Sequence, residues 1–475
     1  MAYRYGERTQ MSLFPASIED YVPKDAPVRA YDVMVAALDI DELGIEYDPG
    51  KVGNSSYDPM VMLKLLVYGY SYGVRSSRKL EREINYNVSF MWLTGGLKPD
   101  HKTISEFRRK NKSALKKVLK QCARLCVRLD LIEGNTLFVD GSKMRANASI
   151  SNSWNQQKCQ QRLKKIDKRI EDILSECDKV DDAEEGRTSL VKLSEQLQDQ
   201  DALKTRVQNI LAELKSEGKT SVNTTDNDCT RIHGRQGSHA GYNSQNVVDE
   251  KHGLIVHSDV VSDNNDLSQF ADQIDQANDT LGKKCKEACG DAGYANCDEL
   301  EKIDAQGIKV IVPSQNQARD KQPKPFDKCK FQYDKEKDCY ICPEGQQLKC
   351  RGVETGRKRK VYGIGGSVCK TCCHFGVCTT DRINGRKITR MLNEEIREKF
   401  ELQYKEPESQ AVYRLRKQKV ELPFGHIKRN LGAGHFLLRG REGVQAEMSL
   451  LSSCFNMARM ISIIGVPGLL VMLMS

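Results

Sequence analysis

The hydrophobic period of the chain changes near residue 133, and this change limits the possible fold more than any other feature. Up to Leu131, apolar residues recur every three or four positions, as they do in amphipathic helices. The segment Glu133–Asp140 instead has a turn followed by a short run of apolar β-forming residues, which is typical of a strand. The sequence therefore predicts an all-helical domain followed by a core that contains both strands and helices.

The predicted helical domain, residues 1–131, is basic at its end. Asp58 and Pro59 form a helix start, and Thr103–Glu106 fits a capping box. Residues 101–130 hold ten Lys or Arg against Glu106 and Asp130. Several short helices with a basic last one favour a DNA-binding bundle. The alternative is a packing domain whose lysines form only a solvated face.

The composition of the whole chain agrees with a polyanionic partner and a reducing compartment. The 475 residues carry a net charge of +9, which suits DNA or RNA. The chain has seventeen cysteines and begins with a polar segment rather than a signal peptide, so thiols or metal ligands are favoured over disulfides. The apolar tail 461–474 is too short to span a bilayer and predicts a packed terminal element. We therefore expect a cytoplasmic protein with no membrane partner.

A strongly charged segment interrupts the core. Apolar residues step by three and four from Leu163 to Cys177 and again from Leu190 to Leu214. This pattern predicts two heptad-patterned helices joined by the polar loop 181–187. The helices are expected to fold back as an antiparallel hairpin, and pairing between two chains is the alternative.

The strand signal returns after this insertion. Gly241–Val248 and Leu254–Val261 predict a β-hairpin, followed by a helix over 267–282 and a strand that ends before Asp291. A second helix over 298–305 precedes the strand Ile308–Pro313. Residues 314–395 are interpreted as rich in loops, and the chain is expected to be helical again from 395 to 460.

Three carboxylates stand out in this order of elements. Asp140 and Asp291 each end a short apolar run, and Glu421 lies on a helical segment. Acidic residues at two strand ends and a glutamate on a packed helix can converge, and hard oxygen ligands suit Mg²⁺ or Mn²⁺. Two such ions can promote an in-line displacement at a phosphodiester.

A cysteine cluster is the second candidate site. Cys339 and Cys342 form one C-x₂-C pair, and Cys369 and Cys372 form another, 26 residues further on. Cys373 and Cys378 follow. Two such pairs can place four thiolates around one Zn²⁺, although the spacer is longer than usual.

The quoted stretches resemble bacterial insertion-sequence transposases of the DDE type, whose catalytic core has an RNase H-like fold. The resemblance rests on four core stretches and on the N-terminal run from Tyr57 to Arg108. These core stretches are Phe138–Asn147, Gly241–Gln245, Asp291–Tyr294 and Val420–Lys428. The resemblance covers nearly the whole chain, and its stretches follow one another in the expected order.

The resemblance implies roles for individual residues. Asp140, Asp291 and Glu421 match the three metal ligands of the family. Tyr413, Arg416 and Lys428 match the accessory signature around the glutamate. The common signature has three residues between its Arg and Glu, whereas four follow Arg416 here, and Lys417 has the nominal spacing. The signature cation is therefore Arg416 or Lys417. Related transposases also carry cysteines that match Cys342, Cys369, Cys372 and Cys378, a zinc quartet without Cys339.

The predicted fold is a mixed α/β sheet in an RNase H-like core with one N-terminal domain and two insertions. The expected segments are a helical DNA-binding domain (1–131), core with Asp140 (132–154), helical insertion (155–231), core with Asp291 (232–313), Cys-rich insertion (314–395) and core with Glu421 (396–475).

The resemblance implies metal-dependent cleavage at insertion-sequence ends and strand transfer to target DNA. The expected cofactors are Mg²⁺ or Mn²⁺ and a structural Zn²⁺. The partners are DNA and further copies of the chain, in association with the nucleoid. The alternatives are a catalytically silent DNA-binding protein derived from a transposase, and a metal-dependent nuclease on the same fold. Intact Asp140, Asp291 and Glu421 favour the active enzyme.

Overall fold

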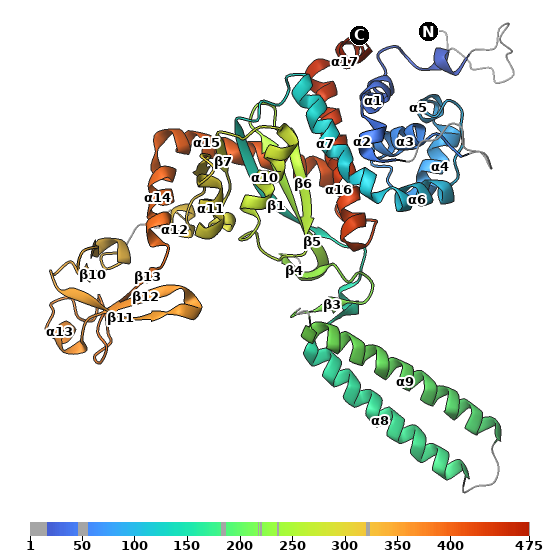
Figure 1. The fold of residues 1–475 in the computed structure, drawn as a ribbon. Helices are drawn as coiled ribbons and strands as arrows, with labels where there is room; N and C mark the ends of the chain where they lie inside the picture. The colour runs from blue at the N-terminus through green and yellow to red at the C-terminus, as the bar shows by residue number, and fades with distance from the viewer. Residues whose placement is uncertain are drawn as a thin grey trace, which may run out of the picture. The chain divides into compact units, whose positions relative to one another are not determined.

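The computed structural model divides the chain into two compact units (Figure 1). The first comprises Met1–Asp266, Asp275–Lys284 and Lys417–Ser475, and the second comprises Leu267–Ile274 and Cys285–Arg416. These units cut across the six segments expected from the sequence. The structure describes residues 17–45, 56–181, 187–216, 218, 221–234, 237–319 and 324–474.

The N-terminal part of the first unit is helical, as predicted. Its helices are η1 (Ile18–Tyr21), α1 (Pro27–Ala36), α2 (Ile40–Leu43), α3 (Pro59–Ser71), α4 (Ser77–Tyr86), α5 (Val88–Leu93), α6 (His101–Lys110) and α7 (Lys112–Arg128). Asp58 caps α3 by accepting a hydrogen bond from the Met60 N–H at 2.8 Å. The capping box at Thr103 was wrong, because α6 begins at His101 and the Asp100 carboxylate accepts from the Thr103 N–H at 2.7 Å.

The strands of the first unit are antiparallel. The central strand is β5 (Gly237–Asp249), which pairs with β4 (Thr230–Gly234), β1 (Thr136–Arg145) and β6 (Ile255–Val261). The predicted hairpin is therefore confirmed as β5 and β6. Asp140 was expected at a strand end, but it lies in the middle of β1, because β5 is long enough to continue the ladder to Arg145.

Helices of the first unit pack on β6. Both α7 and the long helix α16 (Gly440–Ile464) contact this strand and each other. Sixteen residues of α16 are buried, from Gly443 to Met460. A helix that is buried on nearly all its faces is a core element, so α16 forms the centre of the first unit.

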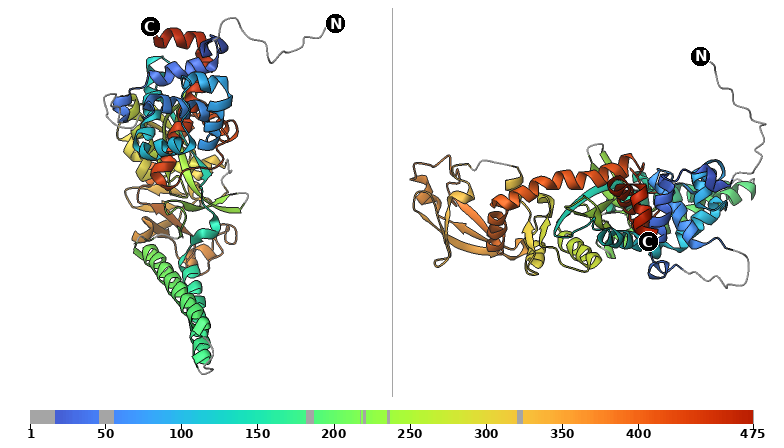
Figure 2. Two further views of the ribbon diagram at one scale, coloured as in Figure 1. Left: turned by 90° about the vertical axis from the view of Figure 1, so that its right-hand side faces the viewer. Right: turned by 90° about the horizontal axis from the view of Figure 1, so that it is seen from above.

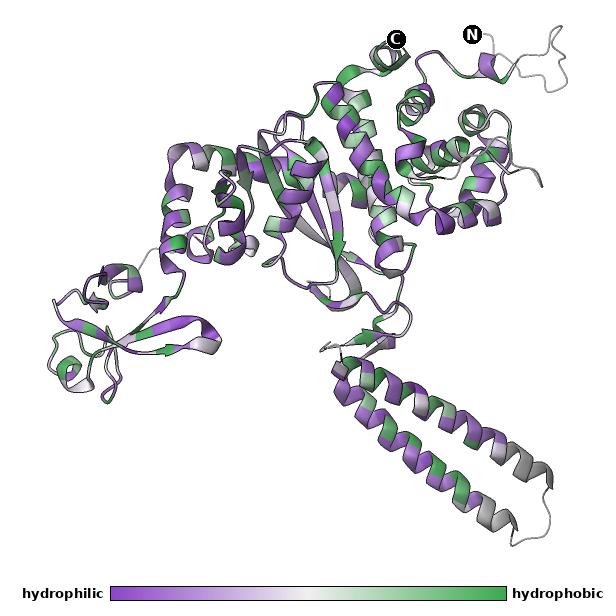
Figure 3. Ribbon diagram, in the orientation of Figure 1, coloured by the Kyte–Doolittle hydropathy of each residue, from purple (hydrophilic) through white to green (hydrophobic). Residues whose placement is uncertain are grey.

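The charged insertion forms a helical hairpin within one chain. Helices α8 (Gln156–Asp181) and α9 (Arg187–Ser216) lie side by side along their length (Figures 1 and 2). Hydrophobic residues recur along both helices between longer hydrophilic stretches (Figure 3). A short pair, β2 (Ser153–Trp154) and β3 (Val222–Asn223), closes the base. Buried Ile166, Val207 and Ile210 belong to its small core. Most of the polar loop 181–187 lies outside the described residues.

The second unit contains the strand that precedes Asp291. β7 (Glu287–Cys289) pairs in parallel with β8 (Lys309–Ile311), and α11 (Cys297–Asp304) connects them. These elements agree with the predicted strand, helix and strand. The second unit also contains η3 (Ala292–Tyr294), α12 (Gln315–Ala318) and α14 (Glu394–Lys405). Helices α10 (Phe270–Leu281) and α15 (Pro407–Arg429) each have residues in both units.

The Cys-rich region is a small β-sheet domain, so its description as loop-rich was wrong. Its strands pair in the order β13-β12-β11-β10-β9, all antiparallel. They are β9 (Gln332–Asp334), β10 (Cys339–Ile341), β11 (Gln347–Glu354), β12 (Arg359–Gly363) and β13 (Lys387–Met391), with η4 (Lys328–Lys330), η5 (Thr355–Arg357) and α13 (Gly366–Lys370) between them. Among the described residues, its hydrophobic core cluster has five buried members: Phe331, Tyr340, Leu348, Tyr362 and Ile388. Strands this short and this polar give a weak hydrophobic pattern.

The apolar tail forms the last helix, α17 (Val466–Met474), which contacts α1 and α16. Val466 and Leu469 are buried, whereas Val471 and Met474 are exposed. Among the described residues, no single helix is long and apolar enough to cross a membrane; only α16 and α17 together pass that test, as a pair bent by 103°.

The fold class is confirmed as mixed α/β with a helical N-terminal part. Antiparallel strands in the first unit and the parallel pair in the second are consistent with an RNase H-like core.

A buried ion pair joins distant segments of the first unit. The Nη1 of Arg75, between α3 and α4, lies 2.8 Å from the Oε1 of Glu447 on α16, and both side chains are buried. The other oxygen of Glu447 accepts from the N–H groups of Leu437 and Leu438, each at 2.9 Å. Arg75 also donates to the carbonyls of Gly432 and His435. The pair therefore fixes the loop that precedes α16.

Replacing Glu447 with alanine should destabilise the protein by about 3–5 kcal/mol, because the buried Arg75 loses its counter-charge. Urea unfolding measures this change. The control Glu442→Ala removes an exposed carboxylate from the same helix and should cost less than about 0.5 kcal/mol. A double variant, Arg75→Met with Glu447→Leu, should recover much of the loss. Equal stability of Glu447→Ala and Glu442→Ala would contradict the role of the pair.

Candidate functional site

Asp140 lies in a row of polar side chains that crosses three strands. It pairs with Asn246 on β5, which in turn pairs with Ser258 on β6. Asn246 is 1% exposed, and neither atom of its amide has a hydrogen-bond partner; the hydroxyl of Ser258 is also buried without one. Buried polar groups are normally satisfied, and each exception calls for an explanation, such as a bound water or ion. The row therefore provides polar groups next to Asp140 that have unused bonding capacity.

Gly141 follows Asp140 because the opposite face of β1 is crowded. A Cβ built there would lie 2.6 Å from the Nε2 of Gln245 and 2.7 Å from the Oδ1 of Asp266. Gln245 and Asn243 both donate to that Asp266 oxygen at 2.7 Å. The sequence did not single out Asp266, which lies in a loop without a motif. Its carboxylate is nevertheless bonded to the strand residues that flank Asp140.

Lys428 is held beside β1. Its Nζ donates to the Oγ of Ser142 at 2.5 Å and to the carbonyl of Lys143 at 3.2 Å. Burial lowers the pKa of Lys428, while the charge of Asp140 acts in the opposite direction. Strand alternation puts Ser142 on the same face as Asp140, so the structure brings this predicted accessory cation to the predicted ligand.

Glu421 belongs to the same helix as Lys428, in the first unit. It lies two turns earlier on α15, and its side chain is exposed. Asp140 and Glu421 are thus residues of one unit, whereas Asp291 is a residue of the other.

Asp291 uses its two oxygens differently. One accepts from the Gly293 N–H at 2.7 Å and so caps η3, which is the ordinary role of an aspartate after a strand. The other lies 3.4 Å from the Nη2 of Arg416, also in the second unit. The Arg416 side chain is 12% exposed, whereas that of Asp291 is 43% exposed, so the aspartate side of this contact is open to water.

The neighbouring signature residues differ in burial. Tyr413 packs edge-on against Tyr404 with ring centroids 5.1 Å apart, and burial raises the pKa of its hydroxyl. Lys417 is exposed. Of the two candidate cations, Arg416 is therefore the one that contacts a predicted ligand directly.

Four predicted zinc ligands line one small cavity in the Cys-rich domain. Cys342, Cys369, Cys372 and Cys378 border a space of about 40 Å³ together with His374. Burial raises the pKa of Cys378; Arg386 opposes this effect, and the charges of the other three thiols add to it. Backbone N–H groups point to two of the sulfurs, from Gln346 to Cys342 at 3.3 Å and from Arg386 to Cys369 at 3.4 Å.

Two further observations concern the ligand set. Cys339 is 2% exposed and, unlike the four predicted ligands, does not line the cavity. Within the described ranges, the group whose ligand atoms all lie within 4.8 Å of one another is Glu344, Cys373 and His374. The sequence did not single out Glu344 or His374, because they belong to no spacing motif.

Two family models match parts of the chain. The first, described as Transposase domain (DUF772), matches residues 16–110, and the second, described as Transposase DDE domain, matches residues 341–461. No curated protein and no solved structure matches the chain significantly.

The matched ranges cover only part of the candidate site. Glu421 and the signature residues on α15 lie within the second match, as do the cavity cysteines. Asp140 and Asp291 lie outside both matches, so their roles rest on the sequence resemblance and on their surroundings.

Proposed function

We propose that the chain is a DDE-type insertion-sequence transposase, which cuts DNA at the ends of its element and joins those ends to target DNA; the matches to a transposase domain and to a transposase DDE domain support this proposal. Water first attacks the scissile phosphate, and the bond from phosphorus to the 3′ oxygen breaks. The freed 3′-hydroxyl then attacks a target phosphodiester, forms a new bond to phosphorus and displaces a target 3′-hydroxyl. Positioning and charge stabilisation provide most of the catalysis in such a reaction.

We assign Asp140, Asp291 and Glu421 as the ligands of the divalent metal. Their carboxylates are the hard donors that Mg²⁺ and Mn²⁺ prefer, and the unpartnered amide of buried Asn246 beside Asp140 fits a site that holds water or an ion. When bound, the metal supplies Lewis-acid stabilisation of the phosphate charge.

The cations on α15 have positioning roles. Lys428, fixed by Ser142 and the Lys143 carbonyl, holds a positive charge near Asp140, where a phosphate must bind. Arg416 orients the Asp291 oxygen that does not cap η3. We therefore assign the signature role to Arg416 and a peripheral DNA contact to exposed Lys417.

The observation that carries the proposal is the Lys428 anchor on β1. It links the helix of Glu421, which lies inside the match to the DDE domain, to the strand of Asp140, which lies outside it. Two of the three assigned ligands thus belong to segments that the structure joins directly.

Asp140→Ala should reduce both end cleavage and strand transfer by at least about 100-fold, because it removes a metal ligand, while DNA binding persists. The measurement is a cleavage and joining assay with Mg²⁺ on DNA that flanks the coding sequence. Asp172→Ala, which removes an exposed aspartate from α8, is the control and should retain full activity. Cleavage by Asp140→Ala at the wild-type rate would refute the assignment.

The same assay separates the alternative functions. Joined products identify a transposase, nicks without joined products identify a metal-dependent nuclease, and binding without either product identifies a silent DNA-binding protein. A chain that forms no joined product would overturn the proposed function.

We also propose a structural zinc site in the Cys-rich domain, formed by Cys342, Cys369, Cys372 and Cys378. Their shared cavity and the N–H groups directed at two sulfurs suit thiolate ligands. The hydrophobic core cluster of the domain has five buried residues among those described, and a core that small usually needs a metal or disulfide to be stable.

The purified wild-type protein should contain one zinc per chain, and Cys372→Ser should lose it, because three thiolates bind the ion much less tightly. Metal analysis by mass spectrometry measures both. Cys339→Ser and Cys373→Ser are matched controls that should keep the metal; its loss in Cys339→Ser would favour the alternative quartet, and its loss in Cys373→Ser would favour the group with Glu344 and His374. A wild-type protein without zinc would reject the site.

A further inference from the structure

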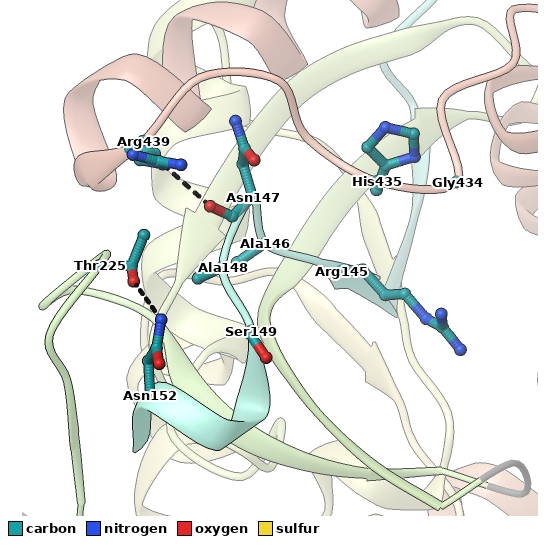
Figure 4. A pocket seen from close by; sticks show the side chains of 10 residues that line it. All are labelled: Arg145, Ala146, Asn147, Ala148, Ser149, Asn152, Thr225, Gly434, His435 and Arg439. Atoms are coloured by element: carbon teal, nitrogen blue, oxygen red, sulfur yellow. Dashed lines mark hydrogen bonds between the residues drawn. The ribbon is translucent and has the colours of Figure 1, made fainter. Parts of the chain in front are cut away.

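A polar pocket lies at the C-terminal end of β1, in the first unit. It has a volume of about 830 Å³ and is bordered by the segment that follows β1 and by the loop before α16. Figure 4 shows Arg145 and His435 on one side of the pocket and Arg439 across from them. Uncharged residues complete the lining, among them the polar Asn147 and Asn152 and the small Ala146 and Ala148.

The ionisable residues that line this pocket are all basic. Its lining contains two arginines and a histidine but no carboxylate. In the described part of the chain, neither Arg145 nor Arg439 forms an ion pair, and both are exposed. The acid nearest in sequence, Asp226, is 3% exposed and accepts hydrogen bonds from Tyr242 and the Gly440 N–H. The positive charge of the pocket is therefore available to a ligand.

The walls of the pocket are held by hydrogen bonds. The Phe436 N–H donates to the Arg145 carbonyl at 2.9 Å, and the Asn147 amide donates to the Leu437 carbonyl at 2.7 Å. The Nε of Arg439 donates to the Asn147 carbonyl at 2.9 Å, a bond drawn in Figure 4. Both segments are thus fixed before any ligand arrives, which lowers the entropic cost of binding.

Nearby arginines affect the pKa of His435. Burial lowers the pKa of His435, and the charges of Arg75 and Arg145 lower it further. Near neutral pH the ring is therefore a neutral hydrogen-bonding group, and the two arginines provide the charge.

We propose that this pocket binds a backbone phosphate of the DNA substrate, with Arg145 and Arg439 as its cationic ligands and His435 as a hydrogen-bonding group. Planar guanidinium groups suit phosphate oxygens, and backbone contacts position DNA without reading its sequence. The inference rests on the proposed function and adds a second anchoring point to it.

The position of the pocket sets the spacing of that anchor. Arg145 is five residues beyond Asp140 on β1, which corresponds to about 17 Å at roughly 3.3 Å per residue. The pocket would hold the flank while the bond near Asp140 is cut.

The test compares DNA binding by wild type and by Arg145→Gln/Arg439→Gln over a range of salt concentrations, using fluorescence anisotropy. The double variant should bind about 10-fold more weakly, and the slope of log affinity against log salt should fall by about 1 to 2, because two cations no longer neutralise phosphate. Arg145→Lys/Arg439→Lys keeps the charges and should keep most of the slope. Circular dichroism of each variant checks the fold.

The matched control is Arg162→Gln/Lys165→Gln, which removes two exposed cations from α8. An equal loss of DNA affinity in this control would show an effect of net charge alone and would overturn the pocket proposal. Two duplexes are used, one from the DNA that flanks the coding sequence and one of unrelated sequence as target. A loss of affinity for either duplex in the double variant supports the pocket proposal and shows which of the two DNAs the pocket binds. Unchanged affinity for both duplexes overturns the proposal.

The outcomes for the pocket and for the function are distinguishable. If wild type binds and joins DNA and the double variant does so equally well, the pocket is refuted and the transposase function stands. If wild type forms no joined product and binds neither duplex, the proposed function fails and the pocket proposal fails with it.

Discussion

The buried ion pair between Arg75 and Glu447 is the contact on which the first unit depends. Two charges removed from water are tolerated only when their remaining hydrogen-bonding groups are satisfied, and here both side chains have backbone partners in the loop before α16. Arg108 reinforces the pair by donating to the Arg75 carbonyl and the Tyr70 hydroxyl. The pair also joins the two segments that match the transposase families. Because that loop carries His435 and Arg439, the same contact shapes the pocket at the end of β1.

Much of the fold follows from local sequence patterns. The helices up to Arg128 and the two heptad-patterned helices are strongly periodic, and tertiary packing does not override such long patterns. The errors fall where a partner decides the structure. Asp140 ends an apolar run, yet β1 continues because β5 pairs with its polar half. The strands of the Cys-rich domain are short and polar, and their core forms only when five of them pair.

The sequence predicts those parts of the candidate site whose residues lie close together along the chain. Carboxylates after apolar runs and cysteine pairs at fixed spacing are visible in the sequence alone. The residues that surround them are not, because they come from distant segments. Asp266 reaches the neighbourhood of Asp140 through Asn243 and Gln245 on β5 and Lys143 on β1, and Arg439 reaches Asn147 across 292 residues of chain. No spacing rule covers contacts of that separation.

The wide separation of Arg75 from Glu447 also affects how the chain is made. At about 5–20 residues per second, roughly 20–70 s pass between the synthesis of these two residues, which are 372 positions apart. During that interval the N-terminal helices have Arg75 without the carboxylate that pairs with it in the finished protein. A ribosome-bound or truncated fragment therefore cannot complete its core and remains open to chaperones and proteases. The first unit becomes stable only when α16 has been synthesised, so premature release yields a product that the cell can degrade before it meets DNA.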